Sequence, residues 1–233
     1  DMATSTTKSA FIAGLLKALP FVVVVVPFAM LFGVVATEAG LPLSQVMAFS
    51  FLVVAGASQF TALQFMSENA PVFVVIVSAL AVNLRMAMYS AAITPHLGAN
   101  PRWVRLLIGY FLVDQSYNLA AIEFEERPNK TLAEKTAFFV GASTPICPLW
   151  YVFTYIGALV GEAIPASFGL DFIVPIAFLA MVAPALRTRA HIAAAFVSIT
   201  LALSLWWIPF NLGLMIAAIM AMITGAEIER RMS

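Results

Sequence analysis

The stretch FVVVVVPFAMLFGVV, residues Phe21–Val35, decides the fold class of this chain. It contains no charged side chain, and the apolar pattern continues past Val35. A bilayer core about 30 Å thick is crossed by about 20 helical residues, so we place a transmembrane span at residues 11–36. The run is too long for the apolar part of a signal peptide, and no small-residue cleavage site follows it, which predicts a retained first span.

The composition of the whole chain indicates an integral membrane protein. Of its 233 residues, 62% are hydrophobic and 10% are charged, and the mean hydropathy is +0.98. Soluble domains are about half apolar and a quarter charged, so a soluble enzyme and a disordered chain are excluded. The 12 basic and 12 acidic residues supply no basic field for nucleic acid. The single cysteine, Cys147, excludes a disulfide framework and a thiolate metal site, and we expect no cofactor.

Further apolar stretches predict further spans. They lie at residues 45–66, 71–93, 103–122, 136–160 and 172–186. The remaining stretch, 191–226, is interrupted by Pro209 and Asn211, and the proline favours two short helices over one long helix. The chain is therefore predicted to be an all-α polytopic membrane helix bundle of seven or eight transmembrane helices, forming a single transmembrane domain over residues 1–233.

The distribution of lysine and arginine predicts that the N-terminus faces the cytoplasm. With eight spans, one side of the membrane collects Lys8, Lys17, Arg127, Lys130, Lys135, Arg187, Arg189, Arg230 and Arg231. Arg102 and Arg105 fall on the other side and argue against this orientation. The four tryptophans, Trp103, Trp150, Trp206 and Trp207, lie near span ends or breaks and are interpreted as interfacial anchors.

One connection, Glu123 to Lys135, is clearly polar, and we interpret it as a solvated loop. Within it, Thr131 and Glu134 have the spacing of a capping box, which predicts that the next helix begins there.

Prolines inside the predicted spans raise the question of broken helices. Proline removes an amide donor, and broken helices survive at membrane depth only where protein or a water-lined cavity satisfies the freed backbone groups. For Thr144–Pro148 we predict a functional break of the kind that transporters aim at a substrate. For Pro20 and Pro27 in the first span, a functional break and a simple kink are equally compatible with the sequence.

A weak sequence similarity between two segments of the chain suggests an internal repeat. Residues 54–59, VAGASQ, resemble residues 140–144, VGAST, in the corresponding span of a second half. If residues 11–93 and 103–186 are repeat halves of three spans each, they are inverted, giving a 3+3 inverted repeat followed by C-terminal helices at 191–226. Small residues also serve plain helix packing, which is the alternative explanation.

Two ionisable residues lie at depth within predicted spans and are functional candidates. Arg85 and Asp114 carry opposite charges at similar depth, so they can form a pair that lowers the cost of burying both. Helical spacing predicts that Asp114 shares a polar face with Tyr110, Tyr117 and Asn118, beside Gln115, and that Tyr89 follows Arg85 one turn later. The pair either fixes helix register or handles substrate and protons, with Arg85 holding a carboxylate and Asp114 changing protonation.

Several segments together resemble the AzlC family, which includes YgaZ-type proteins. They are Ala55–Phe60, Asn83–Arg85 with Tyr89–Ser90, Asp114–Ser116, and Gly169–Phe172 running into Pro175 and Pro184. The resemblance implies the large subunit of an exporter of valine, leucine, isoleucine and methionine in the bacterial inner membrane, working with a small AzlD-type (YgaH-like) membrane subunit. Some relatives carry an acidic residue where this chain has Asn83. If that acid is the proton carrier, either Asp114 takes the role here or the coupling differs. Asp171 is a further acidic candidate or a helix N-cap.

A cavity for such an amino acid needs an apolar pocket, donors for the carboxylate and an acceptor for the ammonium. Phe60, Phe65 and Phe111 are candidates for the pocket, and Asp114 is the candidate acceptor and proton-coupling residue. The candidate substrate-binding residues are Gly56, Ser58, Gln59, Asn83, Arg85, Tyr89, Gln115, Gly141, Ser143 and Thr144.

The leading hypothesis is a proton-coupled secondary transporter and not an enzyme, since no P-loop pattern or soluble domain is present. The alternatives are a channel or scaffold subunit whose partner sets selectivity, and a membrane-embedded lipid-modifying enzyme. The scarcity of histidine, cysteine and carboxylates within the spans argues against the enzyme.

Overall fold

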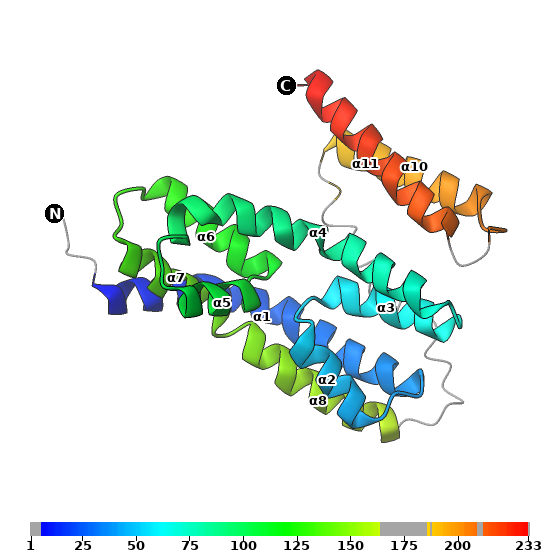
Figure 1. Cartoon of the computed structure of the whole chain (residues 1–233), viewed down its shortest axis with the longest axis horizontal. Coiled ribbons are helices and arrows are strands. Elements are labelled where there is room, and N and C mark those ends of the chain that lie inside the picture. Colours follow the sequence, from blue (N-terminus) through cyan, green and yellow to red (C-terminus); the bar gives the residue numbers. More distant parts are fainter. Residues whose placement is uncertain (1–5, 164–185, 187, 209–211, 233) are drawn as a thin grey trace. The chain divides into compact units, whose positions relative to one another are not determined.

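The computed structural model describes residues 6–163, 186, 188–208 and 212–232, and all regular structure in this part of the chain is α-helical (Figure 1). The helices are α1 (Thr7–Glu38), α2 (Leu43–Leu52), α3 (Gly56–Ser67), α4 (Val72–Leu97), α5 (Arg102–Tyr110), α6 (Asp114–Glu126), α7 (Leu132–Ser143), α8 (Cys147–Ala163), α10 (Arg189–Ser204) and α11 (Leu212–Met232). The chain forms two compact units. The first contains Asp1–Phe60 and Ala79–Phe168, and the second contains Thr61–Ser78 and Gly169–Ser233.

Four helical stretches are long and apolar enough to cross a membrane. They are Thr7–Glu38, Val72–Leu97, Leu132–Gly161 and Leu212–Arg231. The predicted all-α membrane protein is therefore confirmed in class.

The first predicted span is one continuous helix. Thr6 caps α1 by accepting a hydrogen bond from the Ser9 amide, and the helix then continues through both of its prolines, so neither Pro20 nor Pro27 breaks it. The helix ends where Gly40 adopts φ +87°, a left-handed conformation that favours glycine.

Three predicted spans are each divided into two helices. The break at residues 144–146 between α7 and α8 was predicted from the Thr144–Pro148 segment and is confirmed. The predictions of single helices at 45–66 and 103–122 were wrong, because α2 stops at Leu52 before α3, and α5 stops at Tyr110 before α6. Neither of these two breaks contains a proline, so no local feature predicted them.

Helix α1 packs against α7 and α8 through glycines, and the helices run in the same direction (Figure 1). A Cβ atom on Gly14 would overlap the carbonyl oxygen of Phe138, and one on Gly33 would overlap that of Thr154. In turn, Gly141 of α7 and Gly157 of α8 lie against backbone carbonyl oxygens of α1. Backbone therefore meets backbone along this interface, which only small residues permit.

In the second unit, α10 and α11 form an antiparallel pair. Gly213 at the start of α11 lies against Leu205, just past the end of α10, and Gly225 lies against Ala190 and Ala194 near its start. The predicted division of 191–226 into two helices is confirmed. The predicted sixth span at 172–186, with Asp171, Pro175 and Pro184, lies outside the described residues, as do Pro209 and Asn211.

Candidate functional site

The predicted ion pair between α4 and α6 is present. Arg85 Nη2 lies 3.0 Å from Asp114 Oδ2, and the side chains are 35% and 33% exposed. Asp114 is the first residue of α6, and the unpaired amide groups of a helix N-terminus favour a negative charge there. The break between α5 and α6 is what puts this carboxylate at a helix end.

Two tyrosines accompany the pair. Tyr89 follows Arg85 by one turn on α4, and its ring stacks on Tyr117 with centroids 4.1 Å apart and planes 11° apart. The prediction that Tyr110 shares the face of Asp114 was wrong, because the break at 111–113 separates the two residues onto different helices.

Several polar atoms around the pair have no hydrogen-bond partner among the residues that the structure describes. They are Arg85 Nε and Asp114 Oδ1, and both atoms are buried; Asn83 Oδ1, two residues before Arg85 on α4, is also buried and without a partner among the described residues. Buried polar atoms are normally satisfied, and an unsatisfied one costs about 1–3 kcal/mol. The arrangement can therefore take up a further charged or polar group.

The α5–α6 break is stabilised by two serines. The freed carbonyl of Phe111 accepts hydrogen bonds from Ser116 Oγ at 2.9 Å and from Ser143 Oγ at 3.5 Å. Ser116 Oγ also accepts from the Val113 amide at 3.0 Å. Ser143, predicted to bind substrate, makes its shorter hydrogen bond, 2.9 Å, to the Phe139 carbonyl of its own helix, and its binding role stays a prediction.

A tyrosine pair joins all three breaks. The hydroxyl of Tyr110, the last residue of α5, donates to the Phe51 carbonyl at 2.7 Å and lies 2.9 Å from the Tyr151 hydroxyl. Phe51 is free to accept because the Ala55 amide, its partner in a continuous helix, bonds Val53 instead. The ends of α2 and α5 and the start of α8 therefore meet at this tyrosine pair.

At the α2–α3 break, two predicted residues have defined partners. The Ser58 hydroxyl donates to the Ala79 carbonyl at 3.0 Å, which ties α3 to α4. Gln59 is fully buried, and its Nε2 donates to the Phe49 carbonyl at 3.3 Å and to Ser50 Oγ at 3.4 Å. Its Oε1 has no partner in the described part of the chain.

Five aromatic rings surround this break in what we call the aromatic cluster: Phe28, Phe32, Phe49, Phe60 and Trp150. A Cβ on Gly56 would lie 2.7 Å from the Phe28 ring and 2.8 Å from the Trp150 ring, so the rings pack directly on this glycine. Of the predicted pocket residues, Phe60 belongs to the cluster; Phe65 is buried elsewhere and Phe111 contacts Tyr110.

The interpretation of Trp150 as an interfacial anchor was wrong. Its side chain is 7% exposed inside the aromatic cluster, whereas Trp103, Trp206 and Trp207 are largely exposed. Sequence position near a helix break could not reveal this, because the burial comes from packing against α1.

The remaining predicted residues are placed away from these contacts. Gly141 packs against Phe11 of α1, and Thr144 is exposed with its hydroxyl bonded to the Val140 carbonyl. Gln115 is half-buried beside Asp114. Their binding roles stay predictions.

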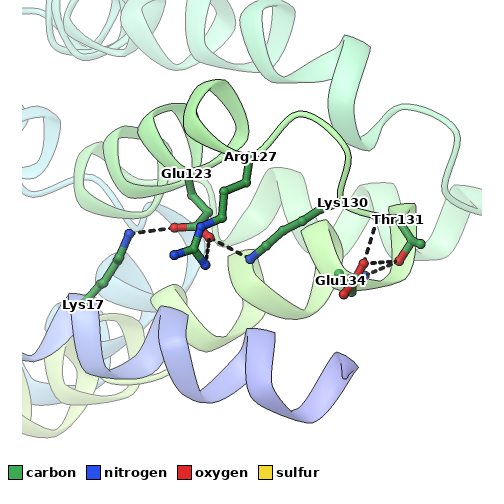
Figure 2. Close-up of polar contacts among 6 residues, drawn as sticks. All are labelled: Lys17, Glu123, Arg127, Lys130, Thr131 and Glu134. Atoms are coloured by element: carbon green, nitrogen blue, oxygen red, sulfur yellow. Dashed lines mark hydrogen bonds and ion pairs between the residues drawn. The ribbon is translucent and has the colours of Figure 1, made fainter. Parts of the chain in front are cut away.

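A second carboxylate of α6 forms the ion cluster shown in Figure 2. Glu123 is fully buried and contacts Lys17 and Lys130, each at 2.6 Å, and Arg127 at 3.3 Å. Interpreting this residue as part of a solvated loop was wrong. The capping box at Thr131 and Glu134 is confirmed, since each side chain bonds the backbone amide of the other residue.

Glu123 lies just beyond the predicted fourth span, and its pKa is set by opposing effects. Burial alone would raise the pKa. Hydrogen bonds from Lys130 and Lys17, together with their positive charges, outweigh the burial and hold the pKa below its ordinary value.

A family model described as AzlC protein matches residues 20–164. The chain belongs to the AzlC family. The matched range of this AzlC-family chain includes the Arg85–Asp114 pair, the aromatic cluster and all three helix breaks, and it stops before α10 and α11.

Relatives extend the similarity over most of the chain. The "Inner membrane protein YgaZ" of Escherichia coli (strain K12) is 23% identical over 209 residues, 87% of this chain and 84% of that protein. An "Uncharacterized membrane protein" of Archaeoglobus fulgidus is 28% identical over 82% of this chain and 83% of its own length. A third, from Helicobacter pylori strain 26695, is 25% identical over 61% of this chain and 58% of its own length. No solved structure matches the chain significantly.

Proposed function

We propose that this AzlC-family chain is a secondary transporter and not an enzyme. It exports small apolar amino acids (leucine, valine, isoleucine and methionine) across the bacterial inner membrane in exchange for protons. A small AzlD-type membrane subunit works with it. The single observation that carries the proposal is the Arg85–Asp114 pair at the broken junction of α5 and α6.

The pair has the chemistry that exchange requires. Arg85 contacts one carboxylate oxygen at 3.0 Å, and a substrate carboxylate can compete for the same guanidinium. Asp114 accepts the substrate ammonium only as a carboxylate. A proton on Asp114 therefore displaces the substrate, and release of that proton restores the substrate site, so the two bind alternately and move in opposite directions.

The predicted 3+3 inverted repeat of seven or eight spans is part of this proposal. Helices α1 and α7–α8 run in the same direction, which suits the first and fifth spans of an alternating bundle. The broken α2–α3 and α7–α8 segments occupy corresponding places in the two halves. The fourth span, broken after α5, has no such counterpart because α1 is continuous.

Counterflow of labelled leucine in proteoliposomes, with and without an imposed pH gradient, tests the proposal. The gradient should accelerate leucine movement, and Asp114→Asn should abolish the acceleration while the protein remains inserted and folded. The assay is made with the chain alone and with the small subunit added. Gradient-driven rates in Asp114→Asn equal to wild type would overturn the coupling role, and absence of leucine movement in both preparations would overturn the function.

A further inference from the structure

We infer that the aromatic cluster above Gly56 is the binding pocket for the amino acid, with Gln59, Trp150 and Thr154 binding its polar groups. This inference rests on the proposed function and adds to it the position and the donor–acceptor set of the substrate site. The proposed contact of the substrate with the Arg85–Asp114 pair is then a separate step of the cycle, at which the proton is exchanged.

Three unsatisfied polar side chains lie in or beside the cluster. Gln59 and Thr154 are fully buried and Trp150 is 7% exposed. Gln59 Oε1, Trp150 Nε1 and Thr154 Oγ1 have no hydrogen-bond partner among the described residues. Each such atom costs about 1–3 kcal/mol. Three in one apolar region need an explanation, and a ligand that bonds them supplies one.

The three side chains come from helices that meet at the cluster. Trp150 and Thr154 are one turn apart on α8 and therefore share a face. That face meets α1, where Thr154 backbone lies against Gly33 and the Trp150 ring is 5.7 Å from the Phe28 ring. Gln59 follows Gly56 by one turn on α3, and the Trp150 ring lies directly over Gly56.

The donor and acceptor types match an amino acid zwitterion. The Gln59 amide nitrogen must face the Phe49 carbonyl, because a carbonyl cannot donate, so Oε1 is left as an acceptor for an ammonium group. The Trp150 indole offers a donor, and the Thr154 hydroxyl can donate as well, which suits a carboxylate.

The rings supply the apolar part of the site. The ring centroid of Phe60 lies 4.9 Å from that of Phe28 and 5.5 Å from that of Phe32. These rings present an apolar surface without ionisable groups, which favours an aliphatic side chain over a charged one. Phe28 and Trp150 fill the space over Gly56 in this structure, so a ligand enters as the Trp150 ring turns aside. Ligand binding should therefore change the surroundings of this indole.

The direct test uses Trp150 as its own reporter. The other three tryptophans are exposed and outside the cluster, so Trp103→Phe, Trp206→Phe and Trp207→Phe together leave Trp150 as the single fluorophore. Titration of the full chain in nanodiscs with L-leucine should shift the Trp150 emission and give a binding constant. L-glutamate at the same concentrations should leave the emission unchanged.

Thr154→Val then separates a binding role from a structural one. It replaces an unpaired hydroxyl by a methyl group of the same shape, so the ligand-free protein should be as stable as its parent or more stable. Leucine binding should weaken about tenfold, the effect of losing one hydrogen bond to a charged group. Thr200→Val is the matched control, since that hydroxyl bonds the Phe196 carbonyl on α10, and leucine binding should stay unchanged.

The outcomes distinguish the pocket from the proposed function. A leucine-dependent shift that weakens in Thr154→Val supports the pocket. Leucine counterflow with no Trp150 response, or with unchanged leucine affinity in Thr154→Val, overturns the pocket and leaves the transport function standing. Neither counterflow nor binding in wild type, with or without the small subunit, overturns both.

Discussion

Asp114 and Glu123 are two carboxylates of the same helix, nine residues apart, with opposite surroundings. Glu123 is fully buried and touches three cations, which occupy both of its oxygens. Asp114 is one-third exposed, touches one cation, and has a buried oxygen without a partner in the described chain. The comparison teaches that ionic contact alone does not define a working site, since the carboxylate with more partners is the one least able to exchange them.

The difference follows from what surrounds each group. Lys130 is almost as buried as Glu123, so neither charge can recover its hydration without moving the chain. Separating them would expose an unpaired charge to an apolar environment, at a cost of about 3–5 kcal/mol. The side chains of the Arg85–Asp114 pair are about one-third exposed, so this contact is less enclosed and can be remade with another partner at lower cost.

Removing the Glu123 charge should have the largest effect on folding. Glu123→Gln leaves Lys17, Arg127 and Lys130 close together without their counter-ion, and we expect the free energy of unfolding to fall by about 3 kcal/mol. Chemical denaturation in detergent measures this, with Glu125→Gln, an exposed neighbour on α6, as the control. Asp114→Asn should lose less than about 1 kcal/mol. Equal losses of unfolding free energy in Glu123→Gln and Asp114→Asn would contradict the distinction drawn between the two carboxylates.

The pH dependence of stability sharpens the same contrast. Because the pKa of Glu123 is held below its ordinary value of 4.5, the carboxylate stabilises the fold fully above that value. The contribution is lost as the pH falls through the lowered pKa. Wild type should therefore exceed Glu123→Gln in melting temperature by a constant amount from pH 7 to about pH 5, and the difference should shrink in more acidic buffer.

A melting-temperature difference that instead grew as the pH fell from 7 to 4 would mean that the protonated carboxyl group of Glu123 stabilises the fold more than the charged one does. That result would contradict the ion cluster shown in Figure 2.

A small effect on stability is also expected for the tyrosine pair that joins the breaks. Tyr110→Phe removes the hydrogen bond to the Phe51 carbonyl and the contact with Tyr151, and should lower the free energy of unfolding by about 1 kcal/mol. Tyr155→Phe, on the same face of α8 as Tyr151, is the comparison variant. If Tyr155→Phe lowered the free energy of unfolding as much as Tyr110→Phe, the Tyr110 contacts with Phe51 and Tyr151 would make no specific contribution to stability.

Features with a local cause were predictable from the sequence. The Thr131 capping box follows from spacing, the break after Ser143 from prolines, and the Arg85–Asp114 pair from opposite charges at equal depth. The breaks after Leu52 and Tyr110 were missed because the groups that satisfy them come from distant parts of the chain. Tyr110 bonds Phe51, and Ser143 bonds Phe111.

For the same reason, only part of the candidate site was predictable from the sequence. Gly56 and Gln59 were selected and lie at the aromatic cluster, whereas Trp150 and Thr154 were not selected as site residues. Only the packing of α8 on α1 shows that they are buried. Polar residues within an apolar helix give no sign in the sequence of whether a partner will meet them in the fold.

The glycine contacts between α1 and α7–α8 determine which parts can move during a transport cycle. Where two backbones touch, no layer of side chains lies between them that could repack as one helix slides. These helices should therefore travel as a single rigid body. In the transport cycle that we propose, the relative motion that opens one side and closes the other then takes place between this body and other helices.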